Sequence, residues 1–284
     1  MMSYKFERKG FTLIELLVVI AVIALLMAVI MPALNKAKQI AAAAVCLANE
    51  NQLIMGYLLY AEDNDSYLAD GDTAAAGSNG YSNYGDGPVH NWVGEPEMPD
   101  LTVDDKIRGF EFGSLWPYLE APKVYNCPAD KRWRKINDDA NPGQINGYRT
   151  YSIGNPLSKR PSSQPGENES TISKLSEFVN PSNKVVFLEE TETEYAWNNR
   201  TWNMSLSISS PAWVDPFAIL HNGSSTFAYA DGHADRHKWV EEVTIEMAKE
   251  GKKNETAILP DGTTSEDWLW FKRAYIPGRR PPGF

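Results

Sequence analysis

Cysteine is scarce in this sequence, and its scarcity excludes a scaffold held together by several disulfides. The 2 cysteines, Cys46 and Cys127, are too far apart in the chain for a CxxC motif of the kind that binds zinc or carries out redox chemistry. They can form one disulfide at most. A folded domain must therefore rest on an apolar core, for which 43% hydrophobic residues provide enough material.

The motifs of common enzyme sites are also absent. The chain has no GxSxG or HExxH string, no phosphate-binding P-loop and no dinucleotide-binding fingerprint. Its formal net charge is -10, whereas nucleic-acid binding needs Lys and Arg gathered against phosphate. The sequence therefore predicts a protein that is not an enzyme and whose main task is not nucleic-acid binding.

A long apolar run near the N-terminus is the first positive feature. Residues 11–31 carry a single charged side chain, Glu15, and as a helix they would span about 30 Å, the thickness of the hydrocarbon core of a bilayer. Basic residues predominate in the ten positions before the run. Because basic flanks stay in the cytoplasm, we expect everything after Met31 to lie outside.

Glu15 is unusual in a simple membrane anchor. A carboxylate within hydrocarbon costs a few kcal/mol on insertion scales, so an acid at this position needs a partner or a function. The alternative is that Glu15 lies near the membrane surface and reaches the aqueous phase.

The string from Lys9 to Glu15, KGFTLIE, resembles the processing site of type IV pilins and type II secretion pseudopilins. The resemblance implies that a prepilin peptidase cuts between Gly10 and Phe11 and that the new N-terminal Phe is methylated. It also implies that Glu15 pairs with the N-terminal amine of a neighbouring subunit during assembly. Pro32 lies where such proteins carry a helix-bending proline.

The resemblance further implies a function, a location and partners. The chain would be a structural subunit of a type IV pilus or a type II secretion pseudopilus, with a single pass through the bacterial inner membrane and an extracytoplasmic C-terminal domain. Its partners would be other pilin-like subunits, the prepilin peptidase and inner-membrane lipid. The alternative is a membrane-anchored module for adhesion or glycan capture, suggested by tryptophans that include Trp197, Trp202, Trp213, Trp268 and Trp270.

The chain divides into a leader at 1–10, a transmembrane half-helix at 11–34, an amphipathic half-helix at 35–62 and a globular domain at 63–284. The amphipathic half has apolar residues at helical spacing, namely Ile40, Ala44, Leu47, Leu53, Ile54, Tyr57, Leu58 and Ala61. Such a stripe must pack on the domain that follows it. Together with the resemblance, this predicts an α+β, type IV pilin-like fold with the long helix against an antiparallel sheet.

Residues 62–105 are acidic and rich in glycine, which predicts an extended loop region with little regular structure. The simplest interpretation is a solvated acidic surface. The alternative is a calcium site, because Ca²⁺ prefers clustered oxygen ligands on a flexible turn. The candidate ligands are Asp63, Asp65, Asp70 and Asp72, although their spacing differs from that of an EF-hand loop. No other cofactor is expected.

The second half of the chain has the pattern of β-structure. Residues 184–189 form a short buried-type strand, and residues 224–230 and 233–240 flank Asp231-Gly232, a strong signal for a two-residue hairpin turn. We expect a type I′ turn with Thr226 opposite His237 and with the aromatic face of the first strand against the helix. Residues 240–250 and 265–274 are predicted to form short surface helices.

His221 and the pair Asp231-Gly232, which follows nine intervening residues later, resemble an element found in pilin-like proteins of planctomycete-type bacteria. The strings that begin at Cys46 and Cys127 resemble the same subfamily. Ligands for zinc could be drawn from His221, Asp231, His233, His237 and Glu189. A strand of seven residues separates the ends of the element by about 20 Å, however, so we interpret it as architectural.

Both cysteines lie in the part of the chain expected to face an oxidising compartment. We therefore predict a Cys46–Cys127 disulfide that fastens the amphipathic half-helix to the globular domain. The alternative is a pair of buried free thiols.

Overall fold

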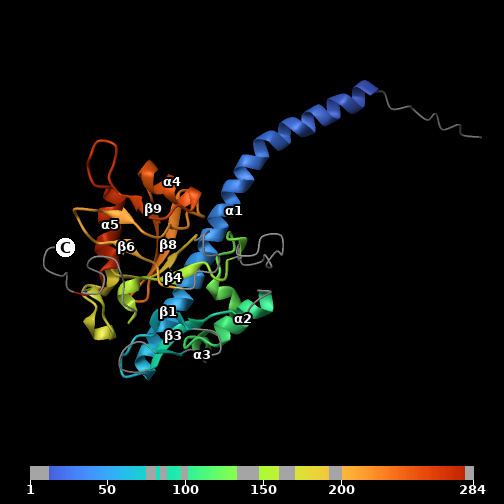
Figure 1. Ribbon diagram of the computed structural model, residues 1–284. Coiled ribbons are helices and arrows are strands. Elements are labelled where there is room, and N and C mark those ends of the chain that lie inside the picture. Colours follow the sequence, from blue (N-terminus) through green and yellow to red (C-terminus); the bar gives the residue numbers. More distant parts are fainter. Residues whose placement is uncertain are drawn as a thin grey trace, which may run out of the picture.

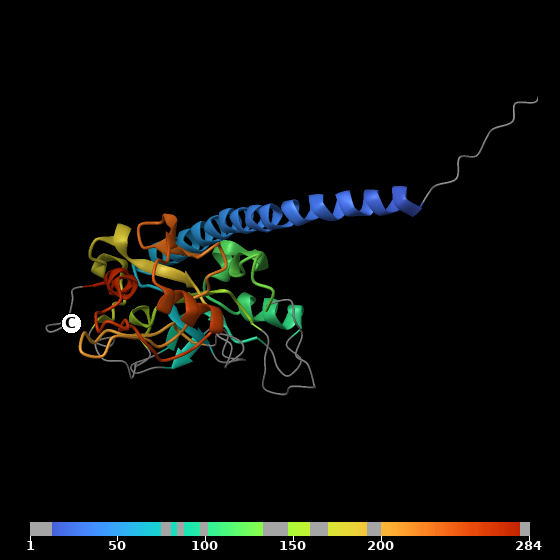
Figure 2. The ribbon, with the colours of Figure 1, turned by 90° about the horizontal axis from the view of Figure 1, so that it is seen from above.

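The computed structural model describes residues 13–74, 81–83, 88–96, 102–132, 147–159, 170–191 and 200–278. Its main feature is α1 (Leu13–Asp63), a single helix of 51 residues that continues through Pro32. Figures 1 and 2 show α1 lying along one side of a globular body and projecting well beyond it. The predicted α+β fold is confirmed, because this long helix is followed by sheets that are mainly antiparallel.

The amphipathic half of α1 packs on the body along one face. The buried residues of α1 are Ala43, Cys46, Asn49, Glu50, Leu53, Ile54, Gly56, Tyr57, Tyr60 and Ala61. The predicted stripe is right from Leu53 onward and wrong at its start, where Ile40 and Ala44 are exposed. Packing begins only at Ala43, and from there the positions that face the body include polar side chains.

The main sheet has four antiparallel strands in the order β4-β5-β8-β9. Their bounds are Tyr151–Ile153 for β4, Val185–Glu189 for β5, Ser224–Tyr229 for β8 and Ala234–Lys238 for β9. Both central strands, β5 and β8, are buried along their whole length. The predicted strand at 184–189 and the predicted hairpin are therefore confirmed as elements.

The details of the β8–β9 hairpin differ from the prediction. Thr226 lies opposite Arg236 rather than His237, so the predicted register was wrong by one residue. The amide of Gly232 donates to the carbonyl of Tyr229 at 2.9 Å, and Gly232 has a positive φ of 99° whereas Asp231 does not. The connection is therefore a three-residue turn with glycine in the left-handed region, and not a type I′ turn.

The faces of β8 are also reversed relative to the prediction. Ala228 and Ala230 belong to the core that contains the buried face of α1. Phe227 and Tyr229 point to the opposite side of the sheet, into a second core. Small side chains on the helix side let α1 approach the sheet closely, and the bulky aromatic residues fill the wider space on the other side.

The second core is built mainly from the C-terminal third of the chain, together with Val185 and Leu188 of β5. It is covered by α4 (Glu242–Glu250), α5 (Glu266–Tyr275) and a small sheet of β6 (Met204–Ser205), β7 (Ala212–Trp213) and β10 (Glu255–Thr256). The two helices confirm the predictions for 240–250 and 265–274. Trp202, Trp213 and Trp268 are fully buried in it, so they present no face to a carbohydrate. Trp197 lies outside the described residues, and Trp270 stacks on His237 with ring centroids 3.5 Å apart.

The acidic region was predicted to be an extended loop, and this was wrong in part. It contains a three-stranded sheet in the order β1-β3-β2, whose bounds are Asp70–Ala74, Pro88–Gly94 and Tyr81–Asn83. β1 and β3 run parallel, and Trp92 of β3 donates to the carbonyl of Gly71 at 3.1 Å. Two further helices follow, α2 (Val103–Glu111) and α3 (Trp116–Leu119). Burial of Trp92 explains why an acidic, glycine-rich segment forms a sheet.

Candidate functional site

The projecting half of α1 is the first candidate site. Every residue from 13 to 34 is exposed, including large apolar side chains such as Leu13 at 80% and Val29 at 71%. By length and composition this part of the helix is able to cross a membrane. Glu15 lies in its first turn and is exposed. Gly10 and Phe11, the predicted processing residues, lie outside the described residues.

The second candidate site is a group of four fully buried side chains that could bind a metal ion, here called the four-residue cluster. Its potential ligand atoms all lie within 4.8 Å of one another, and its members are Cys46, Cys127, Glu189 and His221. Nε2 of His221 lies 2.9 Å from Oε1 of Glu189 and 3.5 Å from Sγ of Cys127. Two thiols, an imidazole and a carboxylate thus converge on one point inside the protein.

Each member of the cluster comes from a different segment with its own local support. Cys46 lies on the buried face of α1. Cys127 follows the 3-10 helix η1 (Pro122–Tyr125), and its amide donates to Oγ1 of Thr150 at 3.0 Å. Glu189 ends β5, and its Oε2 accepts the amide of Thr226 at 2.9 Å.

His221 stands just before β8 at a tight turn. Its amide donates to the carbonyl of Ser224 at 3.3 Å, and Asn222 and Gly223 between them have positive φ angles of 55° and 80°. Asparagine and glycine adopt this left-handed conformation at low cost. The turn brings the imidazole back toward the end of β5.

Burial and mutual contacts shift the pKa values at the cluster. The hydrogen bond with Cys46 and burial both raise the pKa of the Cys127 thiol. Burial opposes a charged imidazole, but hydrogen bonds to Cys127 and Glu189 outweigh it and raise the pKa of His221 to about 10. Burial, and then the charge of Glu189, raise the pKa of the neighbouring Glu50 well above its usual range.

The other residues named in the sequence lie outside the cluster. Nδ1 of His233 lies 2.5 Å from Oδ1 of Asp231, at the exposed tip of the hairpin. The ring of His237 stacks on Trp270, and its Nε2 lies 4.0 Å from Oδ1 of Asp267. The separation of His221 from Asp231 agrees with the strand-length argument, but the proximity of His221 to both cysteines was missed. Its only signal in the sequence was the common subfamily resemblance of the cysteine and histidine strings.

Both cysteines are free thiols in the structure, so the predicted disulfide is not formed there. The thiols of Cys46 and Cys127 share a hydrogen bond, which lowers the pKa of Cys46. Burial and the nearby carboxylates outweigh it, so the pKa of Cys46 is raised overall. The disulfide stays a prediction, and its alternative of two buried thiols describes the structure as it stands.

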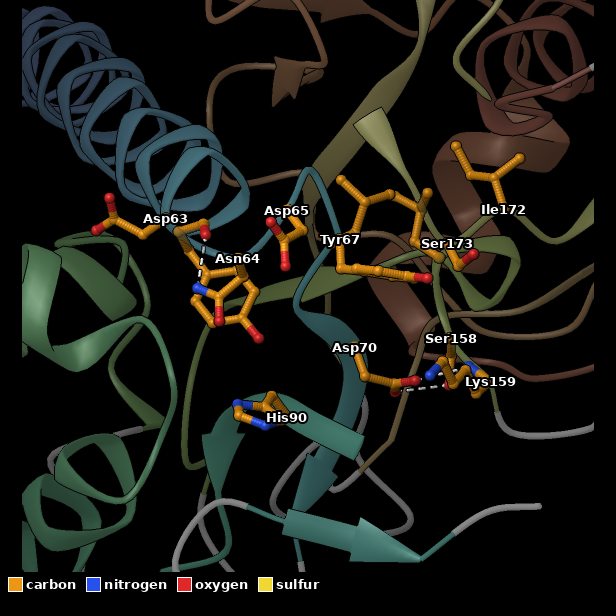
Figure 3. Close-up of a pocket in the computed structure, with 13 residues that line it drawn as sticks. Asp63, Asn64, Asp65, Tyr67, Asp70, His90, Ser158, Lys159, Ile172 and Ser173 are labelled. Carbon is orange, nitrogen blue, oxygen red and sulfur yellow. Dashed lines mark hydrogen bonds between the residues drawn. The ribbon is translucent and has the colours of Figure 1, made fainter. Parts of the chain in front are cut away.

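Three of the four calcium candidates line a cavity of about 380 Å³ at the end of α1, namely Asp63, Asp65 and Asp70. Figure 3 shows Asp70 directed at Ser158 and Lys159, whereas Asp63 and Asp65 lie nearer the helix end. Asp70 accepts hydrogen bonds from Oγ of Ser158 at 2.8 Å and from the amide of Lys159 at 2.6 Å, and burial raises its pKa. Asp70 is therefore already held by contacts within the protein.

Comparison with known proteins gives two matches and one negative result. The family described as a prokaryotic N-terminal methylation motif matches residues 6–31. The type IV wide pilus major component PilA4 of Thermus thermophilus is 48% identical over 61 residues. That match covers 22% of this chain and 47% of the relative, so the chain spans about half the length of the curated protein it matches. No solved structure matches it.

Proposed function

From the premise that the chain is type IV pilin-like, we propose that it is a structural subunit of an extracytoplasmic filament. The projecting half of α1 anchors it in the bacterial inner membrane before assembly and packs among the same helices of other subunits after it. The globular body stays on the extracytoplasmic side.

The observation that carries this proposal is the contrast along α1. Residues 13–34 form an exposed, mostly apolar surface that does not pack against the globular body. The helix from Ala43 onward, in contrast, is part of the core. An exposed apolar surface of this size needs a non-aqueous environment or a partner. A membrane supplies the first, and a bundle of identical helices in a filament supplies the second.

The finer steps follow from the N-terminal string. Prepilin peptidase cleaves between Gly10 and Phe11, and the new terminal amine of Phe11 is methylated. Glu15 then neutralises the amine of an adjacent subunit, which offsets the cost of holding a carboxylate in an apolar surrounding. Pili, type II secretion pseudopili and DNA-uptake filaments share these steps. An experiment is therefore needed to assign the type of filament.

The test is to locate the protein in its native host. Filaments sheared from the cell surface and the membrane fraction are probed separately, and the intact mass of the protein is measured in each. We expect a mature chain that begins at Phe11 in both fractions. A protein confined to the membrane, with residues 1–10 still attached in the presence of an active prepilin peptidase, would refute the proposal.

Deletion strains assign the filament. Loss of the pilus assembly ATPase would remove a pilus subunit from the sheared fraction, while loss of the type II secretion ATPase would remove a pseudopilin. The body itself serves as the control, because its folding and its protease resistance do not depend on either machine.

A further inference from the structure

We propose that the four-residue cluster is a closed, four-coordinate zinc site that fastens α1 to the main sheet. The proposal does not depend on the filament function, because it concerns contacts within one chain. It rests on the convergence of four ligand atoms of the right kind at one fully buried point.

The spacing of the ligand atoms fits a tetrahedral zinc ion. Zinc binds thiolate sulfur at about 2.3 Å and imidazole nitrogen at about 2.0–2.1 Å, so in a tetrahedron these two ligands lie about 3.5 Å apart. Nε2 of His221 lies 3.5 Å from Sγ of Cys127. The nitrogen and Oε1 of Glu189 are 2.9 Å apart, about 0.4 Å closer than two such ligands of zinc. The four ligand atoms lie within 4.8 Å of one another, whereas two thiolates on one zinc are about 3.8 Å apart, so the side chains would have to close in on the ion.

The direction of the imidazole supports a metal over hydrogen bonding alone. The same atom, Nε2 of His221, faces both the sulfur of Cys127 and the carboxylate of Glu189. A single N–H group donates well to only one acceptor. A cation between the three groups would bond to all of them.

The ligand set indicates which ion. Thiolate and imidazole together favour zinc among the common ions, whereas calcium and magnesium require oxygen ligands. Four protein ligands with no exposed member leave no open position for water or substrate. Such a closed site is structural rather than catalytic.

A divalent cation would also stabilise the negative charges that are buried at the cluster. The two thiols and the carboxylates of Glu50 and Glu189 are all buried in one region, where each negative charge is costly. Binding of Zn²⁺ displaces a proton from each thiol and the proton on Nε2 of His221, so both cysteines become thiolates, Nε2 becomes a free donor to the metal, and the metal bonds compensate the thiolate charges. A Cys46–Cys127 disulfide would account for the two cysteines alone, and the 2.9 Å contact between His221 and Glu189 would then be a separate buried hydrogen bond.

The site would join α1, the segment after η1, the end of β5 and the turn before β8. It would therefore fix the angle between α1 and the globular body. Because the four ligands are distant in sequence, their common ion would stabilise the folded chain much as a cross-link does.

The experiment uses the full chain, purified in detergent without a chelator. Zinc per chain is measured by mass spectrometry of the metal, and thiols are counted in the denatured, unreduced protein. We expect one zinc and two reactive thiols. No zinc with no thiols would establish the disulfide instead, and no zinc with two thiols, even after added zinc, would also overturn the proposal.

A matched pair of variants separates ligation from packing. His221→Gln keeps a nitrogen donor near Glu189 but removes a zinc ligand, and His233→Gln makes the same change at the exposed hairpin tip. We expect zinc affinity to fall at least tenfold in His221→Gln and to be unchanged in His233→Gln. Wild-type affinity in His221→Gln would contradict the assignment.

Cobalt substitution tests the site without any mutation. Co²⁺ added to the metal-free wild-type chain should give the visible bands of a tetrahedral complex and a thiolate-to-cobalt charge-transfer band, and zinc should abolish both. Chelation should lower the melting temperature of the wild type and of His233→Gln, and zinc should restore it. An octahedral spectrum without the charge-transfer band would rule out ligation by the cysteines.

Discussion

The two halves of α1 differ in how residue type relates to burial. From Leu13 to Leu34 every side chain is exposed, and all of them except Glu15 are apolar. Beyond Ala43 the helix buries Asn49 and Glu50 while it exposes Met55 at 51%. One continuous helix thus faces two environments, and what lies beside a position, rather than its hydropathy, decides whether it is buried.

Polar residues occur on both halves of α1, and we expect different roles for them. Asn49 is satisfied within the chain, because its Nδ2 donates to the carbonyl of Asn126 at 3.0 Å. Glu15 lies on the projecting half, where our proposal gives it a partner in another subunit. The comparison therefore predicts that changes in the first half affect assembly and changes in the second half affect folding.

The largest effect is expected for Glu15→Val. The substitution makes the projecting half more apolar, so membrane insertion is kept, but the partner of the neighbouring amine is lost. The variant should be present at normal levels in the membrane fraction and absent from sheared filaments. Leu16→Val is the control and should assemble normally. Normal incorporation of Glu15→Val would show that this acid has no role between subunits.

A leucine pair tests the folding side of the comparison. Leu53 is fully buried in the core and Leu25 is 67% exposed on the projecting half. Leu53→Ala leaves a cavity and should lower the free energy of unfolding by about 2–5 kcal/mol. Leu25→Ala should leave it unchanged. Urea unfolding of the full chain in detergent, followed by tryptophan fluorescence, measures both, and equal effects would refute the division of α1.

The sequence predicted the elements better than their faces. The apolar run, the strand at β5 and the helices α4 and α5 follow from local patterns, and all of them are present. The orientation of β8 does not follow locally, because its alternation is the same whichever side faces α1. We expected the larger side chains to meet the helix, but the close approach of α1 requires the small Ala228 and Ala230.

The four-residue cluster was the hardest feature to predict. Its members come from four segments, and the contact between Cys127 and His221 spans 94 positions. No short motif records such a distance, and the strand order that brings β5 beside β8 had to be known first. The N-terminal methylation motif, in contrast, is a linear segment, residues 6–31, and it could be identified from the sequence alone.

A smaller effect is expected where the hairpin meets the second half of α1. Gly232 has a positive φ of 99°, and a Cβ there would lie 3.4 Å from Cδ1 of Leu58 and 3.6 Å from Sδ of Met55. Gly232→Val combines backbone strain with crowding against the helix, and should cost about 2 kcal/mol. Gly262, with a φ of 84° and nothing within 4 Å, is the control. Gly262→Val should cost about 1 kcal/mol, and the same urea experiment measures both.

The smallest effect concerns Asp231, at the exposed tip of the same hairpin. Burial works against its charge, but hydrogen bonds from His233 outweigh burial and hold the pKa of Asp231 below its usual value. A depressed folded-state pKa stabilises the protein above the unfolded-state pKa of about 3.9, and this contribution disappears as the pH falls through the folded-state value.

Asp231→Asn keeps the turn-forming side chain and removes only the charge. Because the two side chains are 34% and 45% exposed, solvent screening should limit the loss to under about 1 kcal/mol at pH 6. Urea unfolding at pH 6 and pH 3 measures the difference between wild type and variant, which should shrink at pH 3. A loss of several kcal/mol at pH 6 would contradict this expectation. It would mean that the contact between Asp231 and His233 helps to hold the hairpin against the second half of α1 and is not merely a solvated surface contact.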